Sequence, residues 1–169
     1  MIRPVRPEEY ERAGRLVVTA YEALPGQHLR EEYARELADV AQRDIDGEVY
    51  VALDGEDEGD DAGHLIGCVT FVPDDTSPLA ELLEDGESGI RMLAVAPSAQ
   101  GSGVGRALLN RCVSRGRELD RAGIILHTTP WMPAAHHLYE TAGFERIPER
   151  DWSPVPQVPL LAYRLRFNE

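Results

Sequence analysis

Lysine is absent from this chain of 169 residues, and all 17 of its basic side chains are arginines. Without lysine, the chain has no Walker A phosphate loop, no Schiff base to pyridoxal phosphate and no kinase-type ATP lysine. The sequence also lacks an apolar run of about 18 residues, which a membrane-spanning helix needs. Its first residues contain no apolar stretch typical of a secretion signal. We therefore expect a cytoplasmic protein.

Cysteine is scarce as well, and basic residues are far fewer than acidic ones. Cys68 and Cys112 lie far apart in apolar surroundings, so we expect two buried free thiols and no disulfide framework. The formal net charge of −13 disfavours nucleic acids and anionic membranes as partners, because both are bound through basic surfaces. His136 and His137 are adjacent on an expected helix and cannot chelate one ion together. We expect no metal.

Hydrophobic periodicity predicts a mixed α/β sheet with helices on both faces. Apolar runs of strand type alternate with segments whose apolar residues recur at helical spacing. A β-α-β unit, with its helix as the crossover, must bring two of the strands parallel. The expected order is β-α-α-β-β-β-α-β-α-β-β. The strands are expected at residues 2–5, 49–53, 65–72, 90–96, 124–129, 144–147 and 161–167, and the helices at 10–24, 29–40, 104–119 and 133–141.

The chain shows no internal repeat and no linker between two cores, so residues 1–169 are expected to form a single domain. Residues 54–61 contain six acids and two glycines. They lack the ligand spacing of an EF-hand, which favours a solvated hairpin loop over a cation site.

Alternating glycines follow the fourth expected strand and open a helix. The segment reads Gln100, Gly101, Ser102, Gly103, Val104, Gly105, Arg106. Glycines let backbone N–H groups approach a phosphate, and a helix N-terminus adds unpaired donors and partial positive charge. The sixth position of the dinucleotide fingerprint is Arg106 here, so that motif is excluded. An anion site and a plain tight turn remain the two interpretations of the loop by itself.

Two motifs together resemble the GNAT superfamily of N-acetyltransferases. Residues 92–108 resemble its motif A, a strand followed by Q/R-x-x-G-x-G/A, and residues 135–144 resemble its motif B, A-x-x-L-Y-E-x-x-G-F. The order of strands and helices fits the same family over essentially the whole chain.

The resemblance implies a GNAT fold in which acetyl-CoA lies between the strands expected at 90–96 and 124–129. Backbone groups of the segment Leu93, Ala94, Val95 would pair with the pantetheine arm, and the loop from Gln100 to Gly105, with Arg106, would hold the pyrophosphate. An amine acceptor would enter from the other side of the sheet. The implied partners are acetyl-CoA and this amine, and a homodimer is left open.

The chemistry of acetyl transfer needs a neutral amine, stabilisation of the thioester oxygen and a proton donor for the departing CoA thiolate. The resemblance places Tyr139 at the thioester sulfur, and a phenol is protonated at pH 7. Tyr139 is therefore the expected catalytic donor, with packing of its helix as the alternative. A backbone N–H near Leu93 would polarise the carbonyl.

The general base is not assigned by the resemblance. Many family members carry a glutamate where this chain has Arg91. Glu87 and His127 are candidates, although Glu87 is also expected to be a solvated loop acid and His127 a satisfied strand residue. A water chain, or no dedicated base, is the further alternative. Arg91 could bind a carboxylate of the acceptor or form a surface salt bridge.

The leading hypothesis is an acetyl-CoA-dependent N-acetyltransferase acting on a primary amine of a small molecule or protein. A non-catalytic acyl-CoA-binding or sensing module on the same fold is the alternative, followed by an O-acyl or longer-chain acyl transferase. The acidic surface favours a cationic acceptor through long-range steering, whereas Arg91 would favour a carboxylate-bearing amine.

Overall fold

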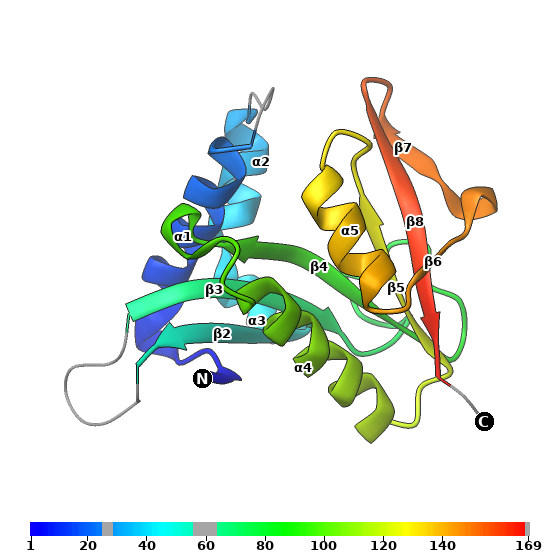
Figure 1. The fold of residues 1–169 in the computed structure, drawn as a ribbon, viewed down its shortest axis with the longest axis horizontal. Helices are drawn as coiled ribbons and strands as arrows, with labels where there is room; N and C mark the ends of the chain where they lie inside the picture. The colour runs from blue at the N-terminus through cyan, green and yellow to red at the C-terminus, as the bar shows by residue number, and fades with distance from the viewer. Residues whose placement is uncertain (25–28, 56–63, 168–169) are drawn as a thin grey trace. The chain divides into compact units, whose positions relative to one another are not determined.

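The computed structural model describes residues 1–24, 29–55 and 64–167. Its backbone forms two compact units. The first comprises Met1–Phe71 and Met92–Arg111, and the second comprises Val72–Arg91 and Cys112–Glu169. The helices and strands (Figure 1) are β1 Ile2–Pro4, α1 Tyr10–Glu22, α2 Glu31–Ala38, α3 Val40–Asp46, β2 Glu48–Asp54, β3 His64–Val72, β4 Glu87–Val95, α4 Val104–Glu118, β5 Gly123–Thr128, α5 Pro133–Thr141, β6 Glu145–Arg146, β7 Trp152–Val155 and β8 Val158–Arg166.

The first unit is built on antiparallel strands. β1 pairs with β2, and β2 pairs with β3, with Val51 opposite Cys68 in the register. Helix α1 buries Ala13, Val17 and Ala20, whose spacing puts them on one face of a helix. A Cβ atom at Gly14 would lie 2.3 Å from the carbonyl oxygen of Ala38, so glycine is what allows α1 to approach the end of α2. Figure 1 shows these two helices side by side.

Helix α4 begins in the first unit and packs closely on β3. A Cβ atom at Gly67 would lie 2.8 Å from the Leu108 side chain and 2.9 Å from that of Val104. The backbone N–H of Ala96, just after β4, donates to the carbonyl of Ile66 at 2.8 Å. The end of β4 and the first turns of α4 are thereby both fixed against β3, and the glycine loop that joins them is held at its two ends.

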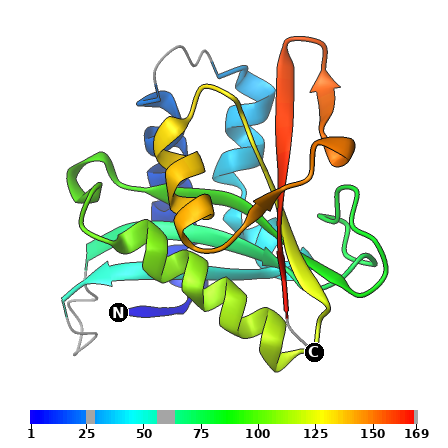
Figure 2. The same cartoon turned by 45° about the vertical axis from the view of Figure 1, so that its right-hand side comes forward.

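The second unit contains the parallel pair that the sequence predicts. β4 pairs with β5 from Glu87 opposite Gly123 to Ile90 opposite Leu126. β5 then pairs antiparallel with β8, which pairs in turn with β6 and β7. Figure 2 shows β7 running beside the long strand β8. A small core in this unit consists of Ile125, Ile147 and Ala162, and the partly buried Leu83 packs against it.

The mixed α/β fold expected from the sequence is confirmed, with two corrections. The single helix expected at residues 29–40 is two helices, because Asp39 (φ −83°, ψ 66°) interrupts it and its side chain caps Gln42 of α3 at 3.2 Å. Tyr33, expected on the buried stripe, is 38% exposed. Strand β7, which lies in a proline-rich stretch, is not among the expected strands. The single-domain organisation stays a prediction.

The acidic segment and the expected absence of a membrane span can be compared with the described residues only. Residues 54–61 lie outside the described residues from position 56 onward, although β2 and β3 on either side pair as the hairpin prediction requires. Within the described ranges, every helix is too short or too polar to span a lipid bilayer.

Candidate functional site

The glycine loop of the first unit has the backbone geometry of an anion-binding turn. Gly101 and Gly103 adopt φ angles of +79° and +88°, a region that side chains rarely enter. Helix α4 starts directly afterwards, and its ladder begins with Ala107 N–H donating to the Gly103 carbonyl at 3.0 Å. The amides of Val104 and Gly105 therefore have no acceptor inside the helix. Such amides and the helix dipole favour a negatively charged group.

The space above the loop is open. A Cβ atom at Gly101 or Gly103 would meet no described atom within 4 Å. The loop itself is stiffened from within, since the Ser102 hydroxyl donates to the Ala99 carbonyl. A short 3-10 turn, Pro97–Ala99, precedes it. These features fit a phosphate group resting on the backbone, which the sequence left as one of two interpretations of the loop.

Strand β4 contains a break that the sequence analysis missed. Met92 has a φ of +54°, which is rare for a non-glycine residue and costs of order 1–3 kcal/mol. The pairing of β4 with β5 ends at Ile90, so the break separates that part of β4 from the segment that contains Leu93, Ala94 and Val95. In this segment Ala94 is buried and the flanking side chains are half-buried. No sequence signal marks the break, because methionine has no preference for positive φ.

Tyr139 lies on α5 in the second unit and is 7% exposed. Its ring packs against those of Phe144 and Tyr163, with centroids 6.1 and 5.9 Å away. Burial raises the pKa of the Tyr139 phenol well above its ordinary value, and the neighbouring Cys112 and Tyr163 add to the shift. Its hydroxyl donates to no other group among the described residues. Tyr139 is therefore a buried phenol that stays protonated.

Glu87 is not the solvated loop acid that the sequence suggested. It begins β4, is 7% exposed and accepts two hydrogen bonds from Arg150, at 2.7 and 2.8 Å. The Glu84 backbone N–H donates to it as well, at 2.9 Å. Burial alone would raise the pKa of Glu87, but these donors outweigh it and the pKa lies below its usual value. A clamped, ionised carboxylate of this kind is a weak general base.

His127 on β5 is half-buried, and desolvation lowers its pKa below the ordinary value. Its Nε2 lies 3.4 Å from the Arg150 carbonyl oxygen, and its ring meets that of Trp152 edge to face at 6.4 Å. A neutral imidazole can accept a proton, so the geometry of His127 is compatible with a base where that of Glu87 is not.

Arg91 forms an ion pair with Glu81 at 3.1 Å and reaches the Leu79 carbonyl at 3.5 Å. The two cysteines are buried free thiols as predicted, and burial raises the pKa of Cys68 to about 12. Among the described residues, no group of three or more His, Cys, Asp or Glu side chains is arranged to hold a metal ion.

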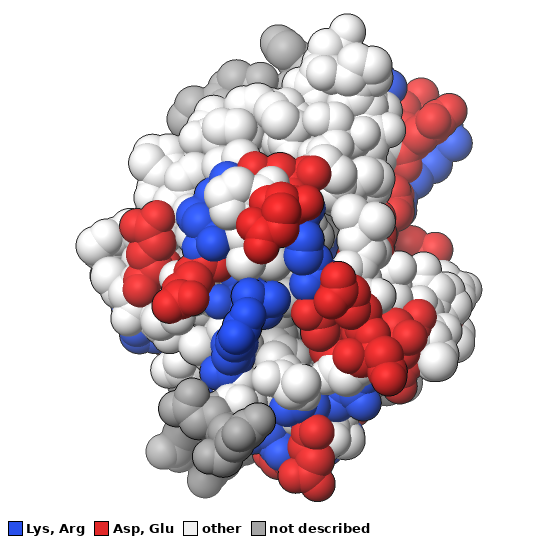
Figure 3. All heavy atoms as spheres, turned by 90° about the vertical axis from the view of Figure 1, so that its right-hand side faces the viewer, with Lys and Arg blue, Asp and Glu red and all other residues white. Residues whose placement is uncertain are grey.

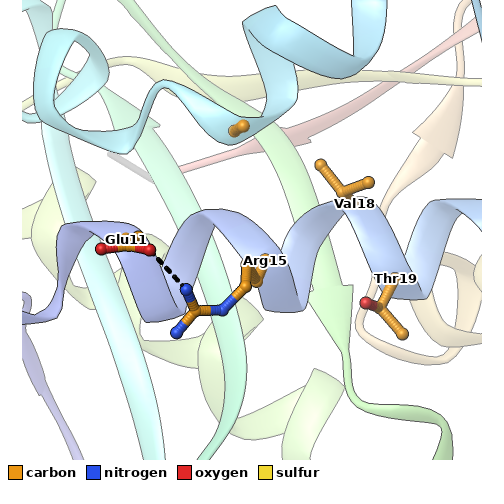
Figure 4. A pocket seen from close by; sticks show the side chains of 5 residues that line it. Glu11, Arg15, Val18 and Thr19 are labelled. Carbon is orange, nitrogen blue, oxygen red and sulfur yellow. Dashed lines mark hydrogen bonds and ion pairs between the residues drawn. The ribbon is translucent and has the colours of Figure 1, made fainter.

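A separate hollow of about 280 Å³ lies along α1 in the first unit. Arg15 forms an ion pair with Glu11 at 2.6 Å. Figure 4 shows this pair, with Val18 and Thr19 further along the same helix. Ala38 completes the lining. None of the residues singled out from the sequence contributes to it.

Comparison with known proteins identifies one family. The model of the Acetyltransferase (GNAT) family matches residues 15–144. No significant match was found among curated proteins. Solved structures share the fold at low identity. An acetyltransferase of the GNAT family from Staphylococcus aureus Mu50 is 15% identical with a TM-score of 0.75, over 98% of each chain.

Two further solved structures have more informative descriptions. The ribosomal-protein-alanine N-acetyltransferase from Brucella melitensis is 21% identical with a TM-score of 0.67, over 99% of each chain. The protein yncA from Salmonella typhimurium, solved with its cofactor acetyl-CoA, is 18% identical with a TM-score of 0.67, over 100% of this chain and 94% of the other.

Proposed function

Since the chain belongs to the GNAT acetyltransferase family, we propose that it transfers the acetyl group of acetyl-CoA directly to a primary amine. The observation that carries this proposal is the loop from Gln100 to Arg106, with its two left-handed glycines and the helix that follows. Acetyl-CoA-bound yncA shares the fold and supports the same co-substrate.

In this proposal, the first unit binds the co-substrate. The pyrophosphate accepts hydrogen bonds from backbone amides of the loop, and Arg106 adds a positively charged fork. The segment Leu93, Ala94, Val95 offers backbone groups to the pantetheine arm, as an added strand would use them. When bound, acetyl-CoA supplies the thioester whose acetyl group is transferred.

The proposed catalytic donor is Tyr139. A phenol is protonated at pH 7, so the Tyr139 O–H can donate to the sulfur as the thiolate departs. A backbone N–H near Leu93 polarises the carbonyl oxygen. The amine must arrive neutral or lose its proton to His127 or to water, since the Glu87 carboxylate is held by Arg150.

Calorimetry with acetyl-CoA tests the proposal. We expect binding at the micromolar level that is usual for such substrates. Gly103→Glu should abolish binding, because the new carboxylate repels the pyrophosphate and fills the space above the loop. Gly55→Glu is the matched control: Gly55 also has a positive φ, of +98°, and open space around it. Equal binding by both variants would overturn the assignment of the loop.

Turnover is tested by CoA thiol release against a panel of amines. Release with at least one primary amine supports the transferase. Binding of acetyl-CoA without release for any acceptor would instead favour a non-catalytic acyl-CoA-binding module, the second candidate. The observation in its favour is Glu87, whose ion pair with Arg150 removes one of the two candidate side-chain bases.

A further inference from the structure

Arg91 and His127 come directly after the paired part of two strands of the second unit. The parallel register of β4 and β5 runs up to Ile90 opposite Leu126, so the next residues on each strand are Arg91 and His127. Successive side chains alternate between the faces of a sheet, which puts these two on the same face. The electrostatics agree: after burial, positive charges that include Arg91 contribute to lowering the pKa of His127.

Trp152 on β7 lies beside His127 and carries a hydrogen-bond donor. Its ring contacts that of His127 edge to face. The indole Nε1–H is buried and has no hydrogen-bond acceptor among the described residues. A buried N–H without an acceptor is costly, because it has lost its bonds to water. The Arg91 guanidinium suits a ligand that brings negatively charged oxygen atoms, and such a ligand could also use the indole N–H.

Glu81 holds the position that such a ligand would take at Arg91. The ion pair is 3.1 Å long, and the Glu81 side chain is 40% exposed while that of Arg91 is 20% exposed. An ion pair with so exposed a partner is weak. The segment between β3 and β4, which contains Glu81, does not depend on that residue for its position. Arg150 anchors the segment separately, through the Leu82 carbonyl and through Glu87.

We propose that Arg91, assisted by Trp152, selects an amine acceptor that carries a carboxylate, a specificity that rests on the proposed acetyl transfer. The acceptor's carboxylate displaces that of Glu81 and forms the paired hydrogen bonds that a guanidinium offers. Long-range steering by the acidic surface acts against such a ligand, but arginines and acidic side chains lie in adjacent patches on the face drawn in Figure 3. One guanidinium in contact outweighs acids that are screened beyond about 8–10 Å.

The test compares amines with and without a carboxylate in direct binding. A panel of L-amino acids and the matching L-amino acid amides is titrated by calorimetry into the acetyl-CoA-saturated protein. The chain has two tryptophans, so Trp131→Phe leaves Trp152 as the sole indole reporter. The variants are Glu81→Gln and Arg91→Gln. Their charge controls in the same unit are Glu84→Gln and Arg166→Gln, which alter exposed side chains.

The two test variants should move in opposite directions. At least one amino acid should bind about 10-fold more tightly than its amide and should change Trp152 fluorescence. Arg91→Gln should remove the preference. Glu81→Gln should strengthen binding of the amino acid several-fold and leave the amide unchanged, because the internal competitor is gone. Both controls should behave as the parent protein. A parent without any preference, or a Glu81→Gln variant that gains nothing, overturns the proposal.

A second arm identifies the source of the carboxylate. Short peptides with an acidic second residue are compared with their glutamine counterparts. A preference confined to amino acids assigns Arg91 to an α-carboxylate, and one confined to peptides assigns it to an acidic side chain. Thiol release distinguishes the acceptor specificity from the transferase activity. Amides acetylated as fast as acids refute the specificity alone, whereas carboxylate binding without release for any acceptor refutes the transferase alone.

Discussion

The two compact units present their candidate functional groups by different physical means. In the first unit, the glycine loop offers backbone amides whose directions follow from φ angles at Gly101 and Gly103. In the second, Glu87 is defined by Arg150, which lies 63 residues away in the sequence. The geometry of a backbone site is therefore determined by the local sequence. The charge state of a buried side chain depends instead on a partner that folding brings to it.

The strongest way to break this comparison is to remove that partner. Arg150→Met should lower the free energy of unfolding by about 3 kcal/mol at pH 7, because it leaves the Glu87 charge buried without its counter-ion. Denaturant unfolding measures the change. Adding Glu87→Gln to the same chain should restore more than half of the loss. A cost below about 1 kcal/mol for the single variant would contradict a structural role for the pair.

Removal of the Tyr139 hydroxyl should separate the proposed catalytic role of this residue from its packing role. Tyr139→Phe keeps the ring contacts with Phe144 and Tyr163 and removes only the hydroxyl. Turnover should fall roughly 10- to 1000-fold, the range of general-acid contributions. The affinity for acetyl-CoA and the melting temperature should stay close to those of the parent. Rates equal to the parent's would reduce Tyr139 to a packing residue.

Acid should weaken the second unit through Glu87. Its pKa is lower in the folded protein than in the unfolded chain, where a glutamate titrates at about 4.3. The stabilisation is thus complete above that pH and is lost as pH falls through the folded pKa. The difference in unfolding free energy between the parent and Glu87→Gln should be constant from pH 5 to 7 and shrink below. A difference that persists unchanged at pH 2 would argue against this linkage.

The smallest expected effect is a gain in stability when glycine replaces a non-glycine residue at a left-handed position. Asp120 follows the end of α4 with a φ of +54°. There the Arg121 N–H donates to the Gly116 carbonyl and the Asp120 N–H to the Arg117 carbonyl. When a helix ends in this pair of backbone hydrogen bonds, glycine is the usual residue at the position of Asp120. Asp120→Gly should raise the free energy of unfolding by about 0.5–1 kcal/mol. Asp120→Ala is the control and should give no gain.

Sequence patterns carried the fold and the loop because both rest on local physics. Apolar spacing set the faces of helices such as α1, and glycines at Gly101 and Gly103 mark a turn that few other residues can make. The break in the helix expected at residues 29–40 was not predicted, because it depends on a single side chain. Asp39 caps α3 and divides the expected helix in two. Strand β7 was missed because prolines hide the pairing of Trp152 with Leu160.

What the sequence by itself determined is the family-level fold, the helix-opening glycine loop and the presence of a phenol at Tyr139, since each depends on residue type and spacing along the chain. Only the tertiary structure decided the state of the charged groups. Arg150 clamps Glu87 and lowers its pKa, Arg91 pairs with Glu81, and burial lowers the pKa of His127. Charges respond to desolvation and to neighbours within a few ångströms, and those neighbours come from strands and loops that are distant in the sequence.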